Sequence, residues 1–353
     1  MRGVAAFFDG WRGLRRFWGL ILLALFTTGA TLQVLGPLPT ARRPENAAVK
    51  REPVPEPVVI HQASPPAGAQ SVRPGRGLPG PVNDPDPALL EPAPGSPTNV
   101  VPRIAADGRR PMQYYAAGFD PTTTRPRVGL LLAGIGLSFA DSKKALTDLP
   151  AQVSFAVSPY TANPEPLLSS ARLRGHEYLL SIPMEPMRFP IADPGPNALM
   201  TSLSPRENQP RLLWALSRLR GYAGATSILG ALRGERLADM PDQIEPVLAE
   251  LGRRGLMYVG APGQASPVPH AWSKSVDVVI DEPATAADID ARLAVLEGMA
   301  RDRGAALGLA VAPRPVTVER IAAWTTGLAN RGLALAPVSA LMLPPATEQE
   351  APK

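Results

Sequence analysis

The 353-residue sequence contains no cysteine and only three histidines, His61, His176 and His270. The absence of cysteine excludes disulfide bonds, thiolate metal ligands and cysteine nucleophiles. Zinc sites in proteins are built from cysteine, histidine and carboxylate ligands, and three scattered histidines do not predict a histidine-rich site. Any chemistry that the chain performs must therefore come from other side chains.

The sequence also lacks the charge pattern of a nucleic-acid-binding protein. Its formal net charge is +5, but no stripe of basic residues interleaved with aromatic residues accompanies that charge. The phrase "GIG" at Gly134–Gly136 lacks the third glycine of a dinucleotide-binding loop, because Phe139 stands in that place. No acidic residue closes the next predicted strand either. We expect neither nucleic-acid nor nucleotide binding.

An uncharged segment, Phe17–Val34, lies near the N-terminus and is 18 residues long. That length is close to the minimum for a helix that spans a bilayer. Four arginines precede it against a single aspartate, so the positive-inside rule places residues 1–16 in the cytoplasm. We expect residues 17–36 to form a transmembrane signal anchor. The alternative is a cleaved signal peptide, although "TGA" at Thr28–Ala30 is a poor cleavage site.

Proline is concentrated in the segment that follows. Of the chain's 43 prolines, 19 lie between Pro37 and Arg125, in phrases such as "REPVPEPVV". Such a stretch has few clustered apolar residues to offset chain entropy, and its prolines favour extended conformations. The composition predicts a disordered linker over residues 37–112, with His61 as an incidental polar residue.

Beyond Met112 the sequence alternates short apolar runs with helical patterns. The phrase "SPRENQPRLLWALSRLRG" has Ser204 as a helix cap and Pro205 in the first turn, while Gly255 and Gly304 follow two further helical patterns. The predicted strands are Val128–Leu132, Val153–Val157, Tyr178–Ile182, Gly224–Ile228, Leu256–Val259, Val276–Ile280, Ala306–Val311 and Leu333–Pro337.

Strands that alternate with helices predict a parallel sheet, and seven or eight repeats suit a distorted β/α barrel. An open doubly wound sheet is the alternative. We expect this domain over residues 113–343, followed by a tail over 344–353. In such folds functional residues follow the carboxyl ends of the strands. His176 opens a predicted strand at the opposite end, so we interpret it as structural.

Five phrases carry a family resemblance: "VSFAVSPYTAN", "GHEYLLSIPMEPM", "DPGPNALMTSLS", "RGLMYV" and "LAPVSALM". Together they resemble the divergent polysaccharide deacetylases of Gram-negative bacteria, a branch of the carbohydrate esterases with a distorted β/α barrel. The resemblance covers roughly Arg125–Leu343. It implies carbohydrate metabolism in the cell envelope, with the anchor in the inner membrane and the C-terminal domain in the periplasm.

The resemblance also implies zinc-dependent deacetylation, in which aspartates and histidines at the strand ends hold a metal that activates water. This sequence departs from that pattern at each such position. Small or apolar residues stand there instead: Ala133 and Gly134, Ser181, Ile228, Gly260 with Ala261, and Ala312. We therefore expect no metal, no cofactor and no catalytic residue of the family type.

Four residues remain as candidate ligand contacts. Glu185 in "PMEPM" and Asp281 after a predicted strand are acidic, and each has a structural alternative: Glu185 as an acceptor for backbone groups in its turn, Asp281 as the cap of a helix beginning near Pro283. Trp272, near His270, offers a ring that can stack on a sugar face, or ordinary loop packing. Arg314 in "APRP" can meet an anionic group.

Three hypotheses about function remain open. The leading one is a membrane-anchored periplasmic pseudoenzyme that binds a glycan or an envelope protein. The second is an active carbohydrate deacetylase or other hydrolase with a non-standard site that uses Glu185 and Asp281. The third is a structural protein of envelope assembly. The missing metal ligands favour a protein without the family's enzymatic activity.

Overall fold

The computed structural model describes Trp18, Ile21 and residues 79–96 and 98–346. The rest of the predicted anchor, and the predicted linker up to residue 78, lie outside the described residues. Among the residues that are described, no helix is long and apolar enough to cross a membrane. The account below concerns the unit that contains residues 79–346.

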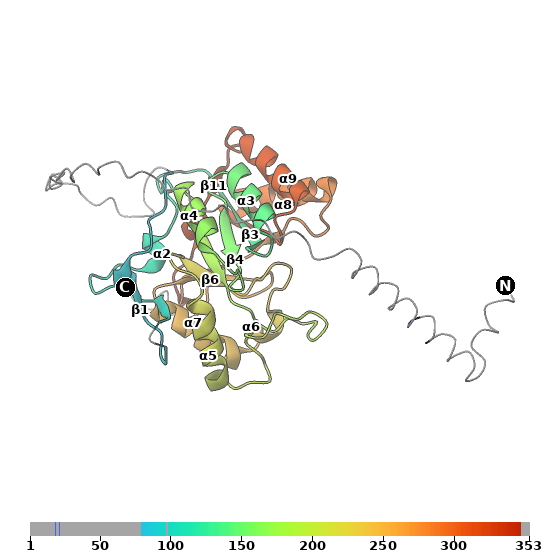
Figure 1. Cartoon of the computed structure of the whole chain (residues 1–353). Helices are drawn as coiled ribbons and strands as arrows, with labels where there is room; N and C mark the ends of the chain where they lie inside the picture. Colours follow the sequence, from blue (N-terminus) through green and yellow to red (C-terminus); the bar gives the residue numbers. More distant parts are fainter. Residues whose placement is uncertain (1–17, 19–20, 22–78, 97, 347–353) are drawn as a thin grey trace, which may run out of the picture. The chain divides into compact units, whose positions relative to one another are not determined.

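The core of the domain is a parallel sheet of nine strands, curled into a half-barrel (Figure 1). Its order is β8-β7-β6-β5-β4-β3-β10-β9, and β11 pairs with β3 beside β4. The strands are β3 (Arg127–Ile135), β4 (Ser154–Val157), β5 (Tyr178–Ser181), β6 (Gly224–Thr226), β7 (Met257–Gly260), β8 (Ser273–Ser275), β9 (Val278–Val279), β10 (Ala305–Ala310) and β11 (Ala334–Ala336). All eight predicted strands are found, whereas β8 was not predicted. The predicted barrel is thus a half-barrel.

Helices follow the strands as the sequence pattern predicts. They are α3 (Phe139–Asp148), α4 (Glu165–Leu173), α5 (Pro205–Leu216), α6 (Glu235–Ala238), α7 (Pro241–Arg253), α8 (Ala286–Arg303) and α9 (Pro315–Thr326). Ser204 caps α5 in a full capping box with Glu207, and Gly304 ends α8 in the left-handed conformation. The predicted caps are therefore confirmed.

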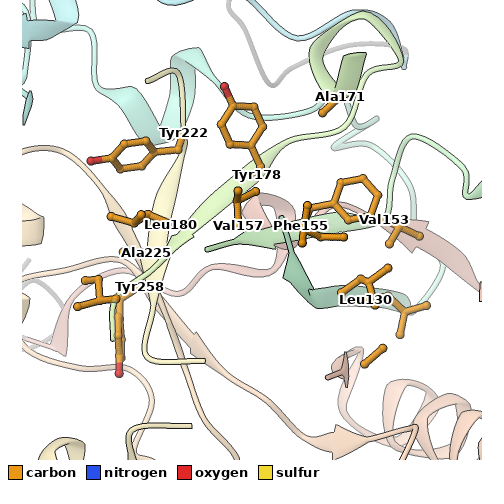
Figure 2. Close-up of a cluster of buried hydrophobic side chains, with 14 of the residues drawn as sticks. Leu130, Val153, Phe155, Val157, Ala171, Tyr178, Leu180, Tyr222, Ala225 and Tyr258 are labelled. Atoms are coloured by element: carbon orange, nitrogen blue, oxygen red, sulfur yellow. The ribbon is translucent and has the colours of Figure 1, made fainter. Parts of the chain in front are cut away.

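Side-chain alternation along the strands divides the interior into two apolar clusters. In β3, Leu130 and Leu132 join the cluster that includes residues of α3, α4, α5, α7, α8 and α9. Figure 2 shows part of this outer cluster, with Phe155, Leu180 and Tyr258 drawn from β4, β5 and β7. Leu131 and Ala133 point the other way and join the inner cluster, on the concave face of the sheet.

Residues 79–119 close the amino-terminal end of the half-barrel. The segment contains η2 (Pro87–Leu89), a two-stranded antiparallel sheet of β1 (Leu90–Pro92) and β2 (Val100–Pro102), and α2 (Pro111–Tyr114). Its apolar side chains belong to both clusters, and Leu89 and Val101 are fully buried. The prediction of a disordered linker is therefore wrong for residues 79–96 and 98–112. High proline content does not prevent packing when apolar residues are spaced between the prolines.

Two buried arginines tie this segment to the helices. Arg254, which is 1% exposed, pairs with Glu91 at 2.8 Å and donates to the carbonyl of Pro102. Arg172, which is 4% exposed, pairs with Asp84 at 3.0 Å. Because each guanidinium is out of solvent, these partners offset the cost of burying its charge.

A buried carboxylate lies where β3 changes neighbours. On one side β3 pairs with β11 at its start and with β4 at its end. Glu177, just before β5, accepts hydrogen bonds at this fork from the backbone of Ala117 and Ser339 and from the hydroxyls of Ser154 and Ser339. The same carboxylate thus joins the N-terminal segment, β4 and the residues after β11.

We predict that Leu89→Ala lowers the free energy of unfolding by about 2–5 kcal/mol, because it opens a cavity beneath a side chain with no solvent exposure. Leu173→Ala is the matched control, since that leucine is 74% exposed and should change stability by no more than about 0.5 kcal/mol. Chemical denaturation of the purified protein measures both. Equal, small effects would mean that the segment around Leu89 does not pack on the domain.

Candidate functional site

The positions at which the family places metal ligands lie at the carboxyl ends of the strands, and apolar packing occupies them. Ala133 at the end of β3 and Ile228 after β6 are both fully buried. They belong to the inner cluster together with Ala261 after β7 and Val311 after β10. The concave face is thus filled by its own side chains at this end of the half-barrel.

The backbone closes the same region further. Gly134 has φ +74°, and a Cβ atom there would lie 3.1 Å from the carbonyl oxygen of Val311. The turn between Leu229 and Leu232 lies against Gly134 and Val311. A Cβ atom on Gly230 would be 3.6 Å from the carbonyl oxygen of Val311 and 4.0 Å from the Cα of Gly134. An aspartate at position 134 would need a strained backbone and a displaced neighbour.

The zinc ion that the resemblance implies does not fit these residues. Ser181 is the sole side chain with a donor atom among the positions Ala133, Gly134, Ser181, Ile228, Gly260 and Ala312, and its buried hydroxyl has no hydrogen-bond partner. Zinc requires about four nitrogen, sulfur or carboxylate ligands. Within residues 79–96 and 98–346, no three His, Cys, Asp or Glu side chains are grouped so that they could hold a metal.

Glu185 is engaged by the protein itself. It is 3% exposed, and one carboxylate oxygen accepts from the backbone N–H of Thr201 at 2.7 Å and from its hydroxyl at 2.8 Å. The other oxygen pairs with Arg236 at 3.0 Å. This arrangement fixes the loop after β5 against the start of α6, as the structural interpretation of Glu185 predicts.

Asp281 and Arg314 form an ion pair at the carboxyl ends of β9 and β10. Asp281 accepts from the N–H of Val311 at 2.8 Å, from Arg314 at 3.1 Å and from the Thr317 hydroxyl at 3.3 Å. Burial raises the pKa of Asp281 above its ordinary value of 3.8, although these donors oppose the shift. Asp281 therefore supports the start of α9. The predicted capping of a helix near Pro283 is wrong, because Thr285 caps α8.

Trp272 lies away from these strand ends. It precedes β8, which runs parallel to β7, so it sits at the amino-terminal edge of the sheet. His270 packs beside α7, where its Nε2 is 3.6 Å from Glu245. The prediction that the loop with His270 and Trp272 lies beside the site is wrong, because the polar strand β8 that follows it was not predicted. His176 is buried at the amino-terminal edge between the carbonyls of Val153 and Leu146, and burial lowers its pKa.

Among the described residues, no hydrogen bond or ion pair links Glu185, Trp272 and the Asp281–Arg314 pair to one another. The four candidate contacts do not form one constellation.

An open groove of about 400 Å³ lies beside the filled interior, and we call it the strand-end groove. It is formed by loops that follow β3, β4, β5 and β6. Its lining residues are Leu137, Tyr160, Asp193, Pro194, Gly195, Pro196, Leu229, Gly230, Ala231 and Leu232. The groove combines one aromatic ring and one exposed carboxylate with apolar walls, which is typical of small-molecule sites.

Backbone conformation positions these groove residues. Gly195 has φ +96°, and a Cβ atom there would lie 2.6 Å from the hydroxyl oxygen of Tyr160. Asp193 accepts from the N–H of Gly195 at 2.8 Å, which shapes the turn. Sequence reasoning did not propose Tyr160 or Asp193 as site residues. The signal was present, because "VSPYTAN" and "DPGPNAL" are two of the phrases that carry the resemblance.

We predict that the stability of Asp281→Asn, relative to the unchanged protein, rises as the pH increases from about 4 to about 7. The folded-state pKa of Asp281 is raised, so the unchanged protein loses stability as the pH rises through that value, whereas asparagine does not ionise. Thermal unfolding of both proteins across this range measures the difference. A relative stability that falls with pH would contradict the direction of the shift.

One comparison with a solved structure supports this architecture. The chain resembles the crystal structure of the uncharacterized protein ATU2773 from Agrobacterium tumefaciens C58, with 32% identity and a TM-score of 0.64 over 69% of this chain and 99% of the other. A second structure, titled a "putative cellobiose-phosphate cleavage protein" (EF3048) from Enterococcus faecalis V583, has 12% identity and a TM-score of 0.44 over 62% and 100%. No curated protein matches.

The family model described as divergent polysaccharide deacetylase matches residues 130–342. That range runs from β3 to the end of η4 (Val338–Leu341) and includes every strand of the half-barrel. This chain belongs to the divergent polysaccharide deacetylase family, whose description points to a function related to carbohydrate.

Proposed function

We propose that this protein binds a carbohydrate in the strand-end groove and does not deacetylate it by the family's metal mechanism. The observation that carries the proposal is the contrast between two neighbouring regions. The family's metal positions are packed with apolar side chains, whereas an open groove with polar and aromatic groups lies directly beside them.

The groove has groups suited to a sugar. A sugar ring has apolar C–H faces and a rim of hydroxyls, so it needs both a flat apolar surface and hydrogen-bond acceptors. Tyr160 supplies a ring, and the exposed carboxylate of Asp193 supplies acceptors. Leu137, which is 61% exposed, adds apolar surface at the edge.

Location in the periplasm is part of the proposal. The uncharged segment Phe17–Val34, with arginines before it, supports a single membrane anchor with the carbohydrate-related domain outside the cytoplasm. A chain without cysteine is compatible with that oxidising compartment.

The competing enzyme hypothesis needs Glu185 and Asp281 as acid and base. Each has its carboxylate oxygens engaged by partners from other segments of the chain, and general acid–base catalysis requires two groups poised on one substrate. The structural hypothesis needs no ligand at all. Two measurements separate the three.

The first prediction concerns metal and turnover. Purified protein should retain no stoichiometric zinc and should release no acetate from acetylated glucosamine oligomers with added zinc, manganese or cobalt, because the family positions lack ligands. Elemental analysis and an acetate assay measure these. One tightly held metal per chain, or turnover abolished by Glu185→Gln or Asp281→Asn, would establish the enzyme hypothesis instead.

The second prediction concerns binding. Acetylated glucosamine oligomers should raise the melting temperature of the protein, and Tyr160→Ala and Asp193→Asn should each reduce that rise, since ligand binding stabilises the folded state by mass action. Asp302→Asn is the matched control, because Asp302 is an exposed acid on α8 outside the groove. No rise with any glycan tested would favour the structural hypothesis.

A further inference from the structure

A second and larger groove, of about 640 Å³, runs along α5, and we call it the α5 groove. One wall is the turn between β1 and β2, with Ala93, Pro94, Ser96 and Asn99. The other wall is a single face of the helix, with Pro205, Arg206, Gln209, Pro210, Leu213, Trp214 and Ser217. This spacing of three and four residues places all seven helical residues along one side of α5.

Helix α5 presents this face rigidly. Its first turn is held by the capping box of Ser204 and Glu207, and its opposite side is anchored by the buried Leu212 and Leu216. Trp214 is only partly buried and packs against the outer cluster. The indole ring is therefore held against the domain while it lines the groove.

An aromatic pair connects the two grooves. Tyr160 lines the strand-end groove and Trp214 lines the α5 groove, and their ring centroids are 5.3 Å apart at an interplanar angle of 42°. A ligand that lies on Tyr160 can therefore continue onto Trp214 without leaving the protein surface. Two tilted rings in succession suit a chain of linked sugar rings.

Arginines follow the same path. Arg211 donates to the carbonyls of Ala198 and Pro196 beside the strand-end groove, and Arg218 lies 5.6 Å from the centroid of the Trp214 ring. Arg206 is exposed in the α5 groove. In the described part of the chain none of the three pairs with a carboxylate, unlike Arg172 and Arg254. Unpaired guanidinium groups favour carboxylate or phosphate ligands.

We propose that the α5 groove is an extension of the carbohydrate site and takes an acidic saccharide, whose sugar ring stacks on Trp214 and whose successive anionic groups meet Arg206 near the start of α5 and Arg218 just after its end. This inference rests on the proposed function, because the same glycan chain occupies the strand-end groove. Neutral sugar units contact Tyr160 and Asp193, and acidic units contact α5.

The test compares two glycans of equal length by calorimetry: an acetylglucosamine oligomer, which is neutral, and a hyaluronan oligomer, in which acetylglucosamine alternates with glucuronate. The unchanged protein should bind the acidic oligomer more tightly, and more so at low salt. Arg206→Gln, Arg218→Gln and Trp214→Ala should weaken acidic binding by about tenfold, as expected for central tryptophan and arginine contacts. The two arginine variants should leave binding of the neutral oligomer nearly unchanged.

Arg292→Gln is the matched control, because Arg292 is an exposed arginine on α8 and its loss removes the same charge. The exposed Arg206 makes its variant a test that does not depend on repacking around Trp214. If the two oligomers bind equally and the α5 variants change neither, this inference is wrong while carbohydrate binding stands. If neither oligomer binds, both proposals fail together.

Discussion

The fold depends on the buried carboxylate of Glu177. On one side of β3, its first residues pair with β11 and its last residues pair with β4. The backbone N–H groups just after β11 therefore have no neighbouring strand to bond with. Ser154 accepts from Val338, and Glu177 accepts from Ser339 and from Ala117 in the N-terminal segment. The two oxygens of one carboxyl group can accept several hydrogen bonds, and leaving such donors buried without a partner is costly. The Glu177 side chain thereby satisfies the backbone groups at the fork in the sheet while the amino-terminal end of the half-barrel stays closed.

The packing of the half-barrel interior limits where a ligand can bind. Residues 79–119 and Glu177 fill the amino-terminal end of the half-barrel, and the inner cluster continues to Ala133, Ile228 and Val311 at the carboxyl end. The two grooves described above lie instead on segments around this packed region. Both grooves are built from such peripheral segments: the turns after β3 to β6, the helix α5 and the β1–β2 turn.

The sequence predicts most of the strands because they are short apolar runs between helical patterns, as in the buried run Leu130–Leu132 of β3. It fails for β8, whose residues Ser273–Ser275 are polar, and this failure misplaces Trp272. It also fails for residues 79–96 and 98–112, because composition reports proline content but not the burial of Leu89 and Val101 in the domain core. The strand-end groove could not be derived from spacing, since Tyr160 and Asp193 meet only through the loops after β4 and β5.

The apolar packing at the family's metal positions and the missing ligands are two aspects of one physical condition. Carboxylates at Ala133 or Ile228 would be buried charges, and without a metal ion or paired cation such charges are strongly destabilising. Apolar side chains at the same places instead gain free energy from burial. The resulting interior is stable without a metal, and the turn over Gly134 and Gly230 can then approach the strand ends closely. The groups left for recognition are those outside this packed region, which is where the aromatic rings and unpaired arginines lie.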